Sequence, residues 1–340
     1  MSRFDVGPRM CWFAHVYGRG PQAPRLPRTV VAAVAALVLL ATTAAAWGAT
    51  GVITTAAGTG TPGFAGDGGP AAAARLSAPV DVERMPDGGF LITDQGNQRI
   101  RRVSPDGVIS TFAGTGTAGA GGDGGPATAA ELRTPNGLAA SPDGGVLIAD
   151  SANHRVRYVS PAGVISTVAG TGVQGAGGDG GQATAAQLNF PSGVAVLPDG
   201  GFLIADNDNH RVRRVSPGGV ISTVAGTGVA GSAGDGGAAT SAQLNDPAGV
   251  EALPGGGFLV SELGGHRVRQ VDAAGTITTM FGTGAPGSAG DGGPAAAAQV
   301  NGPIGLALLP AGGFVTAESA GNRVRRVAPD GSAGTLAGTG

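Results

Sequence analysis

Three kinds of polar residue recur along this chain at a regular spacing, and each could support a known chemistry. Aspartates in Gly-rich loops can bind calcium, clustered histidines can bind zinc, and rows of arginines can bind nucleic acid. The aspartates lie in five GDGG motifs, at Asp67, Asp123, Asp179, Asp235 and Asp291. Three histidines (His154, His210 and His266) precede arginines of a five-membered set, Arg99, Arg155, Arg211, Arg267 and Arg323.

The GDGG aspartates are predicted to be structural. Each loop supplies one carboxylate, whereas calcium takes about six to eight oxygen ligands, several of them from carboxylates. An aspartate shortly before Pro70, Pro126 or Pro294 suits the cap of a helical turn, because Pro is favoured at the first helical position. We therefore expect a cap, keep a calcium site as the weaker alternative, and predict no other metal or cofactor.

The histidines are also predicted to be structural, because they occupy one template position in successive repeats. If each repeat is one blade of a ring, strand spacing places equivalent positions on the order of 15 Å apart. Zinc needs ligands at about 2.0–2.1 Å. Gln98 and Asn322 fill the same position in the other repeats, so a hydrogen-bonding side chain is sufficient there.

Each of the five arginines follows an acid by five residues. The acids are Asp94, Asp150, Asp206, Glu262 and Glu318. Across a tight turn this offset suits a cross-strand salt bridge or a carboxylate–backbone turn bond. A nucleic-acid track would need a basic excess and stacking aromatics, whereas the net charge is −2 and aromatic residues make up 4%.

All these residues belong to one template that repeats every 56 residues, which indicates an array of one supersecondary unit. Residues 191–225 contain four short apolar runs separated by turn residues such as Pro198-Asp199-Gly200-Gly201. Four antiparallel strands of this kind form one propeller blade. A β-solenoid is the competing architecture, but calcium-binding β-rolls repeat every nine residues or so. A Gly-rich linker with one helical turn, at Ala238–Leu244, joins successive blades.

The recurring A-D…N-H-R-V-R-R-V element, seen at Ala205-Asp206 to Val215, resembles the NHL repeat, with Arg in place of the signature Leu. The linker GDGGPATAAQL is similar to that of exported bacterial NHL-repeat proteins. This resemblance covers 51–340 and implies an all-β propeller, usually of six blades. The family's functions include protein and RNA binding, receptor ectodomains and a few lyases.

The blade count does not close a six-bladed ring. The first three strands occur five times, starting near Pro79, Pro135, Pro191, Pro247 and Pro303. The fourth strand occurs six times, because Gly51–Ala57 matches it as well. We expect five complete four-stranded blades plus this extra outer-type strand. The alternatives are five-bladed closure, a truncated product or completion by another chain, and we favour truncation or an incomplete ring.

Positions that differ between repeats are the candidates for a unique binding site. In a propeller the start of the first strand borders the central channel. The candidate residues for this channel mouth are Asp81, Asn136, Phe190, Ser192 and Asp246. Neutral variation in exposed loops is the alternative explanation.

The first 50 residues differ in composition from the repeats. Five arginines precede an apolar run, Val30–Leu40, which ends in Ala44-Ala45-Ala46. This order is typical of a secretory signal cleaved after Ala46. An uncleaved anchor at Thr29–Trp47 is the alternative. Either way we expect the repeats outside the cytoplasm, secreted or held at the membrane through residues 29–47.

We therefore expect a non-catalytic module that recognises a protein or small molecule. A membrane-anchored sensor ectodomain and a propeller lyase are the alternatives. The resemblance implies that a lyase of this kind needs metal ligands or a catalytic histidine that converge on the central channel. We expect no histidine of this chain to lie at the channel.

Overall fold

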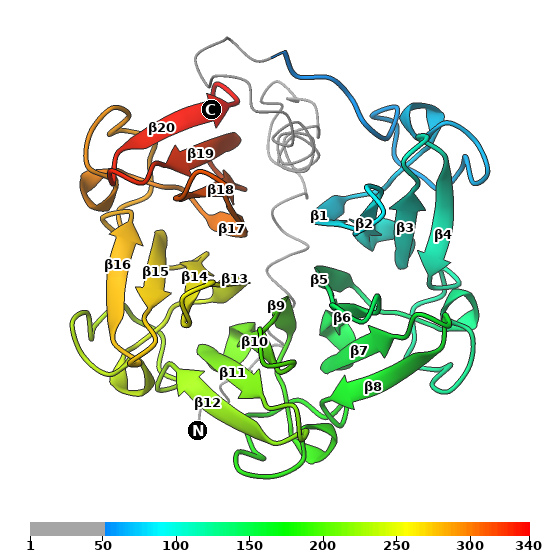
Figure 1. The fold of residues 1–340 in the computed structure, drawn as a ribbon, viewed down its shortest axis with the longest axis horizontal. Helices are drawn as coiled ribbons and strands as arrows, with labels where there is room; N and C mark the ends of the chain where they lie inside the picture. Colours follow the sequence, from blue (N-terminus) through cyan, green and yellow to red (C-terminus); the bar gives the residue numbers. More distant parts are fainter. Residues whose placement is uncertain (1–51) are drawn as a thin grey trace, which may run out of the picture.

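The computed structural model describes residues 52–340, which form five blades arranged around a central axis (Figure 1). Each blade is a four-stranded antiparallel sheet whose strands follow chain order. The predicted all-β propeller is confirmed, with five blades. The predicted signal or anchor lies outside the described residues. Within residues 52–340 no helix is long and apolar enough to cross a membrane.

The strand boundaries repeat closely from blade to blade. Blade one contains β1 (Pro79–Arg84), β2 (Phe90–Asp94), β3 (Arg99–Val103) and β4 (Ile109–Ala113). Blade two contains β5 (Pro135–Ala140), β6 (Val146–Asp150), β7 (Arg155–Val159) and β8 (Ile165–Ala169). Blade three contains β9 (Pro191–Val196), β10 (Phe202–Asp206), β11 (Arg211–Val215) and β12 (Ile221–Ala225). Blade four contains β13 (Pro247–Ala252), β14 (Phe258–Glu262), β15 (Arg267–Val271) and β16 (Ile277–Phe281). Blade five contains β17 (Pro303–Leu308), β18 (Phe314–Glu318), β19 (Arg323–Val327) and β20 (Ala333–Ala337).

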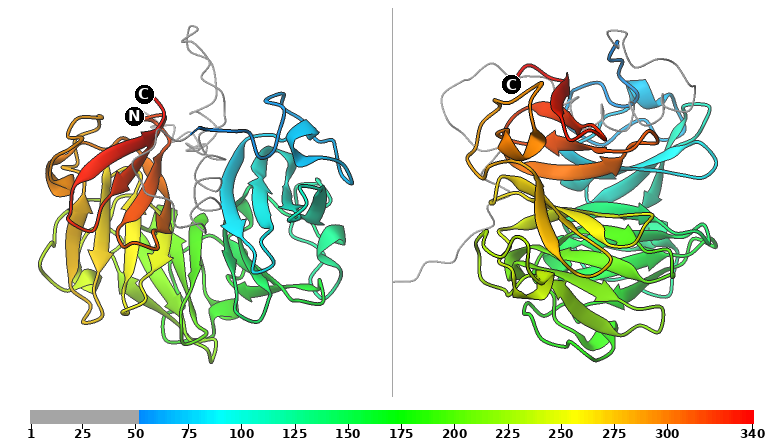
Figure 2. Two further views of the ribbon diagram at one scale, coloured as in Figure 1. Left: turned by 45° about the horizontal axis from the view of Figure 1, so that its top comes forward. Right: turned by 60° about the vertical axis from the view of Figure 1, so that its left-hand side comes forward.

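Short 3₁₀ turns complete the template. One set lies in the linkers: η2 (Ala71–Ala73), η4 (Ala127–Ala129), η6 (Ala183–Ala185), η8 (Ala239–Ser241) and η9 (Ala295–Ala297). The other set joins the second and third strands: η3 (Gln95–Asn97), η5 (Ser151–Asn153) and η7 (Asn207–Asn209). The strands of each blade run between two faces of the ring (Figure 2). We call the end with the linkers and the second-to-third-strand turns the linker face.

Most of the core lies between blades, where the sheets of neighbouring blades pack face to face. Leu203, Val212 and Ala225 of blade three pack with Val250 and Val260 of blade four in one buried cluster. The β-branched residues suit such pleated, doubly covered strands. The tight turns between the first and second strands lie at the end of the blade opposite the linker face. They need a residue in the left-handed backbone conformation, and in blade three Gly200 adopts it with φ of 87°.

Each linker covers the outer strand of the blade that follows it. In blade three, the Gly180 N–H donates to the Ile221 carbonyl at 2.8 Å, and the Ile221 N–H donates to the Gly181 carbonyl at 3.0 Å. The same pairing recurs at the outer strand of every blade. Exposed strand edges invite pairing with other chains, and the linker satisfies this edge.

The blades form an open series. Neighbouring inner strands pack in the order β1, β5, β9, β13, β17, and among the described residues no comparable packing joins β17 to β1. Blade five and blade one therefore face each other across an opening (Figure 1). The strand predicted at Gly51–Ala57 does not form over its described part. Val52–Ala57 is irregular, and every third strand among the described residues is already paired on both sides.

Candidate functional site

A buried arginine at the third position of each third strand organises the polar interior of its blade. In blade three, Arg213 is fully buried, lies 3.3 Å from Asp206 on β10, and lies 2.7 Å from Asp179 of the GDGG loop. The same pairs occur as Arg101 with Asp67 and Asp94, Arg157 with Asp123 and Asp150, Arg269 with Asp235 and Glu262, and Arg325 with Asp291 and Glu318. Each arginine therefore holds its linker against its own blade.

This network corrects two sequence predictions. The GDGG aspartate does not cap the helical turn, because no side chain caps any of the linker 3₁₀ turns. Asp179 instead accepts hydrogen bonds from Arg213 and from the Thr223 hydroxyl, the latter at 2.7 Å. The acid before the turn pairs with the arginine at the third position of the strand, Arg213 in blade three, and not with the arginine at the first position. Arg211 donates to the Thr227 carbonyl at 3.0 Å.

A carboxylate–backbone hydrogen bond was predicted across the tight turn that follows the acid. The acid does accept a backbone hydrogen bond, but from the linker and not from the turn. Asp206 accepts from the backbone N–H of Asn189 at 2.7 Å, in the linker that leads into the same blade. Its second oxygen accepts from the Asn209 amide at 2.7 Å. The acid thereby joins the linker, the η7 turn and the buried arginine.

The histidines connect consecutive blades on the linker face. The Nδ1 atoms of His154, His210 and His266 accept hydrogen bonds from the N–H of Phe190, Asp246 and Gly302, at 3.1, 3.3 and 3.2 Å. Gln98 does the same for Thr134 at 2.6 Å. The accepting histidine must be neutral, and burial lowers the pKa of His154 and of His266. At each of these blade junctions the side chain therefore forms part of the blade–blade contact.

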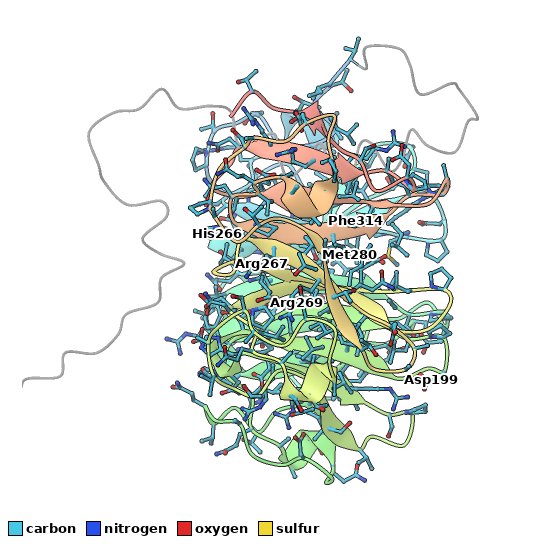
Figure 3. All side chains as sticks on the ribbon, turned by 90° about the vertical axis from the view of Figure 1, so that its left-hand side faces the viewer. Asp199, His266, Arg267, Arg269, Met280 and Phe314 are labelled. Atoms are coloured by element: carbon cyan, nitrogen blue, oxygen red, sulfur yellow. The ribbon has the colours of Figure 1, made fainter. Side chains whose placement is uncertain are left out.

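Figure 3 shows this arrangement in blade four, where His266, Arg267 and Arg269 follow one another along the start of β15. Met280 of β16 and Phe314 of β18 belong to the apolar contact between blades four and five. Recurrent polar groups and apolar contacts thus come from the same template positions in each blade.

The five predicted channel-mouth residues do not form one surface. Phe190 is 6% exposed, and the buried Ser192 hydroxyl donates to the Ala248 carbonyl at 2.8 Å. Asn136 is half-buried on β5, and its carbonyl accepts from the Thr93 hydroxyl at 2.6 Å. Asp246, whose side chain is 41% exposed, lies 3.4 Å from His210 on the linker face. Asp81 lies on β1 and belongs to a different group.

That group consists of Asp81, Glu83 and Glu251, which we call the ring-axis carboxylates. They extend from two inner strands, β1 and β13, that lie on opposite sides of the axis (Figure 1). Asp81 accepts from the Leu138 N–H at 2.7 Å, and Glu83 accepts from the Ala140 N–H at 3.0 Å. Glu251 accepts a backbone hydrogen bond from Leu308. Each carboxylate therefore reaches the inner edge of the next blade.

Their environment disfavours ionisation. Burial raises the pKa of Asp81 to about 6, of Glu251 to about 7 and of Glu83 to about 8. The negative charges of Asp81 and Glu251 raise the pKa of Glu83 further. Backbone N–H donors oppose these shifts but do not cancel them. Near neutral pH these carboxyls are therefore partly protonated.

Sequence reasoning missed Glu83 and Glu251. Both residues lie four positions after the first proline of their inner strand, whereas the predicted channel-mouth residues lie within two positions of it. In the other blades this position is alanine, at Ala139, Ala195 and Ala307. The difference between the repeats at this position is therefore the sequence signal that identifies Glu83 and Glu251. Among residues 52–340, no group of three or more His, Cys, Asp or Glu side chains is arranged to hold a metal ion.

Solved structures similar to this chain are propellers with different activities. A streptogramin B lyase matches with a TM-score of 0.50 and 14% identity, covering 76% of this chain and 68% of that chain. A gluconolactonase from Xanthomonas campestris matches with a TM-score of 0.52 and 16% identity, covering 77% and 76%. An auxiliary nutrient binding protein from Bacteroides thetaiotaomicron matches with a TM-score of 0.54 and 12% identity, covering 76% and 57%. At these identities the likeness establishes the fold alone.

Sequence comparisons identify the repeat. The chloroplastic protein SUPPRESSOR OF QUENCHING 1 of Arabidopsis thaliana is 34% identical over 85 residues, which are 25% of this chain but only 8% of that protein. The family model of the NHL repeat matches residues 132–157 and 188–215, in blades two and three. The other blades have the same strands and the same buried Arg–acid pairs. The chain therefore contains NHL repeats within a β-propeller of five similar blades.

Proposed function

We propose that this chain is an exported, non-catalytic recognition module that binds a protein or small-molecule ligand at the linker face and the ring axis. The observation that carries this proposal is the placement of the non-repeated acids. Asp81, Glu83 and Glu251 replace Gly or Ala of the template and extend from the inner strands toward the next blade. The recurrent acids, by contrast, are bonded within the scaffold.

The chemistry of these carboxylates favours a cationic ligand group. An ammonium or guanidinium that enters between β1 and β13 would stabilise the ionised forms, which burial and mutual repulsion otherwise disfavour. The ligand would therefore bind together with release of protons. Asp246, exposed on the linker face, would add a further negative charge at the edge of this region.

The proposal is tested by calorimetric titration of the chain with 1,6-diaminohexane as a probe. We expect binding that strengthens between pH 6 and pH 9. Binding by a Glu83→Gln/Glu251→Gln variant should be about thirtyfold weaker, since two lost charge pairs of about 1 kcal/mol each amount to about 2 kcal/mol. Glu131→Gln is the control, because Gln occupies that template position in blades three, four and five. Equal binding by the double variant would rule out the ring-axis carboxylates as the site.

A lyase-type enzyme is the second candidate, and one observation favours it. Asp81 and Glu83 lie two residues apart on β1 with pKa values of about 6 and about 8. At neutral pH such a pair offers one ionised and one protonated carboxyl, as general acid–base catalysis requires. Turnover of a lactone or a cyclic ester that is lost in both Asp81→Asn and Glu83→Gln would favour the enzyme over the recognition module.

Export also stands as part of the proposal, with a retained anchor at residues 29–47 as the alternative. The apolar run that follows five arginines in the N-terminal segment supports it. Cell fractionation with sequencing of the mature N-terminus distinguishes the two forms. A new N-terminus near Trp47 in the soluble exported fraction indicates cleavage, whereas recovery of the whole chain with membranes indicates a sensor ectodomain.

A further inference from the structure

We propose that the ring axis binds a zwitterion, a small molecule that carries both an ammonium and a carboxylate group, as amino acids do. This inference rests on the proposed function and names the ligand class of that site. The ring-axis carboxylates hold the ammonium. Backbone N–H groups of β9 and β13, the inner strands of blades three and four, hold the carboxylate, and both strands lie beside the axis (Figure 1).

Each inner strand presents backbone N–H groups at the edge that faces the preceding blade. Ladder bonds of an antiparallel pair alternate, so every second residue directs its N–H away from the partner strand. The Leu197 N–H, just after β9, donates to the Gly201 carbonyl at 2.8 Å. By this alternation Val194 and Val196 direct their N–H groups away from β10. The equivalent residues of β5 and β13 are Leu138, Ala140, Val250 and Ala252.

In blades three and four these N–H groups have no acceptor among residues 52–340. The blades that precede them have Gly and Ala where blade one has Asp81 and Glu83, so no side chain reaches the N–H groups. A Cβ atom at Gly193 would lie 3.1 Å from the Val250 nitrogen. Val194 and Val250 are each 5% exposed, and a buried donor without a partner costs free energy. A ligand that supplies an acceptor would remove this cost.

The chain itself shows which acceptor suits these N–H groups. Where a side chain reaches one of them in the next blade, that side chain is a carboxylate. The three contacts of this kind join Asp81 to Leu138, Glu83 to Ala140 and Glu251 to Leu308. An ionised acceptor forms a stronger hydrogen bond than a neutral one. A ligand carboxylate would therefore make in blades three and four the contact that the chain's own carboxylates make in blades two and five.

The charges beside the axis favour a ligand with both groups over a ligand with one. A molecule with a carboxylate alone would be repelled by the ionised forms of Glu83 and Glu251. A molecule with an ammonium alone would leave the N–H groups of β9 and β13 without an acceptor. A zwitterion provides a cation for the acids and an anion for the N–H donors, and it adds no net charge to the site.

The test is calorimetric titration of the full chain with three probes of similar length: 6-aminohexanoate, 1-aminohexane and hexanoate. We expect 6-aminohexanoate to bind about tenfold or more tightly than 1-aminohexane, because its carboxylate gains charge-assisted hydrogen bonds. Hexanoate should not bind. Titration with 4-aminobutanoate and 8-aminooctanoate then gives the spacing between the two charged groups that the site prefers.

A substitution that copies the chain's own contact tests where the ligand carboxylate lies. Ala195→Glu gives β9 the residue that β1 has as Glu83, and its carboxylate should accept from the Ala252 N–H. We expect 6-aminohexanoate to bind about tenfold more weakly, because the added carboxylate occupies the donor, and 1-aminohexane to bind at least as tightly as before. Ala307→Glu is the control, because it adds the same charge at the same template position of β17, which no described inner strand follows. It should not weaken the binding of 6-aminohexanoate.

Two results would overturn the proposal. Equal affinity for 6-aminohexanoate and 1-aminohexane in the parent chain would show that the axis binds a cation and nothing more, and this comparison holds even if Ala195→Glu does not fold. Equal weakening of 6-aminohexanoate binding by Ala195→Glu and Ala307→Glu would indicate a general effect of charge. In either case binding of 1,6-diaminohexane that depends on Glu83 and Glu251 still supports the proposed recognition site. Absence of binding by the diamine and by every zwitterion would refute both proposals together.

Discussion

At the scale of single residues, identical residue types have different roles that depend on burial. Arg213 is fully enclosed between two acids, whereas its neighbour Arg214 pairs with Asp199 at the surface, where the side chains are 35% and 47% exposed. A buried charge that loses its partner is strongly destabilising, and a surface pair contributes little. The two arginines therefore provide an internal comparison within one strand.

We predict that Arg213→Met lowers the free energy of unfolding by about 3–5 kcal/mol, because it leaves the buried Asp206 without a counter-charge. Arg214→Met, with the same change in side chain, should cost less than about 1 kcal/mol. Urea denaturation followed by circular dichroism measures both. Similar losses in the two variants would mean that the Arg–acid network does not hold the blade together.

A second residue-scale prediction concerns pH. Glu83 has a pKa of about 8, above the usual 4.5, so its ionisation opposes folding. Its contribution to stability is complete below pH 4.5 and is lost as the pH rises through 8. Glu83→Gln should therefore raise the melting temperature at pH 9 by about 2–4 °C, equivalent to about 1 kcal/mol, and leave it unchanged at pH 4.

The measurement is scanning fluorimetry of Glu83→Gln across this pH range beside the Glu131→Gln control. Glu131→Gln should follow the parent chain at every pH. An equal shift at pH 4 and pH 9 would attribute the effect of Glu83→Gln to packing, and the ionisation argument would then be wrong.

At the scale of elements, most of the blade could be predicted from the sequence. The short runs and the Pro-Asp-Gly-Gly turn predicted four strands within residues 191–225, and the structure places β9 to β12 there, from Pro191 to Ala225. The side-chain partners of the acids could not be predicted in the same way. Arg211 and Arg213 lie two residues apart on one strand, and the sequence pattern does not distinguish them. Only the folded linker, which brings Asp179 beside Arg213, distinguishes them. The ring-axis carboxylates also depend on contacts between blades, which no single repeat encodes.

The inner strands offer an element-scale prediction with a matched pair of sites. Gly193→Ala would place a Cβ atom 2.4 Å from the Ala248 carbonyl oxygen, so the two strands would have to separate. We expect a loss of about 1–3 kcal/mol, typical of overpacking. Gly305→Ala has room in the described structure and should be neutral or stabilising by up to about 1 kcal/mol.

Chemical denaturation of the two variants tests this pair. The expected order is Gly193→Ala below the parent chain and Gly305→Ala at or above it. A loss in Gly305→Ala as large as in Gly193→Ala would show that glycine at this position serves the strand's own conformation and not the approach of a neighbouring blade.

At the scale of the whole molecule, an open series of blades should unfold from its ends. In repeat arrays stability is a sum of local and nearest-neighbour terms, and the terminal blades one and five have one described neighbour each. Opening of a terminal blade therefore breaks one blade–blade interface, while opening of blade three breaks two.

Two strands with the same sequence allow this to be measured directly. β11 and β19 both read RVRRV, so their intrinsic exchange rates match. We predict that hydrogen exchange of β19 amides is about tenfold or more faster than that of β11 amides. Equal protection would indicate that the five blades open as one cooperative unit.

The constant sequence separation of the polar contacts has a consequence for how such a gene can change. The GDGG aspartate and its buried arginine are 34 residues apart in every blade. In blades one to four the aspartate and its threonine are 44 residues apart, and the junction acceptor and its N–H donor are 36 apart. Unequal crossing-over between two copies adds or removes a whole 56-residue unit and keeps all three separations. Blade number can therefore vary by recombination alone, without any compensating point mutation in the contacts that hold the blades together.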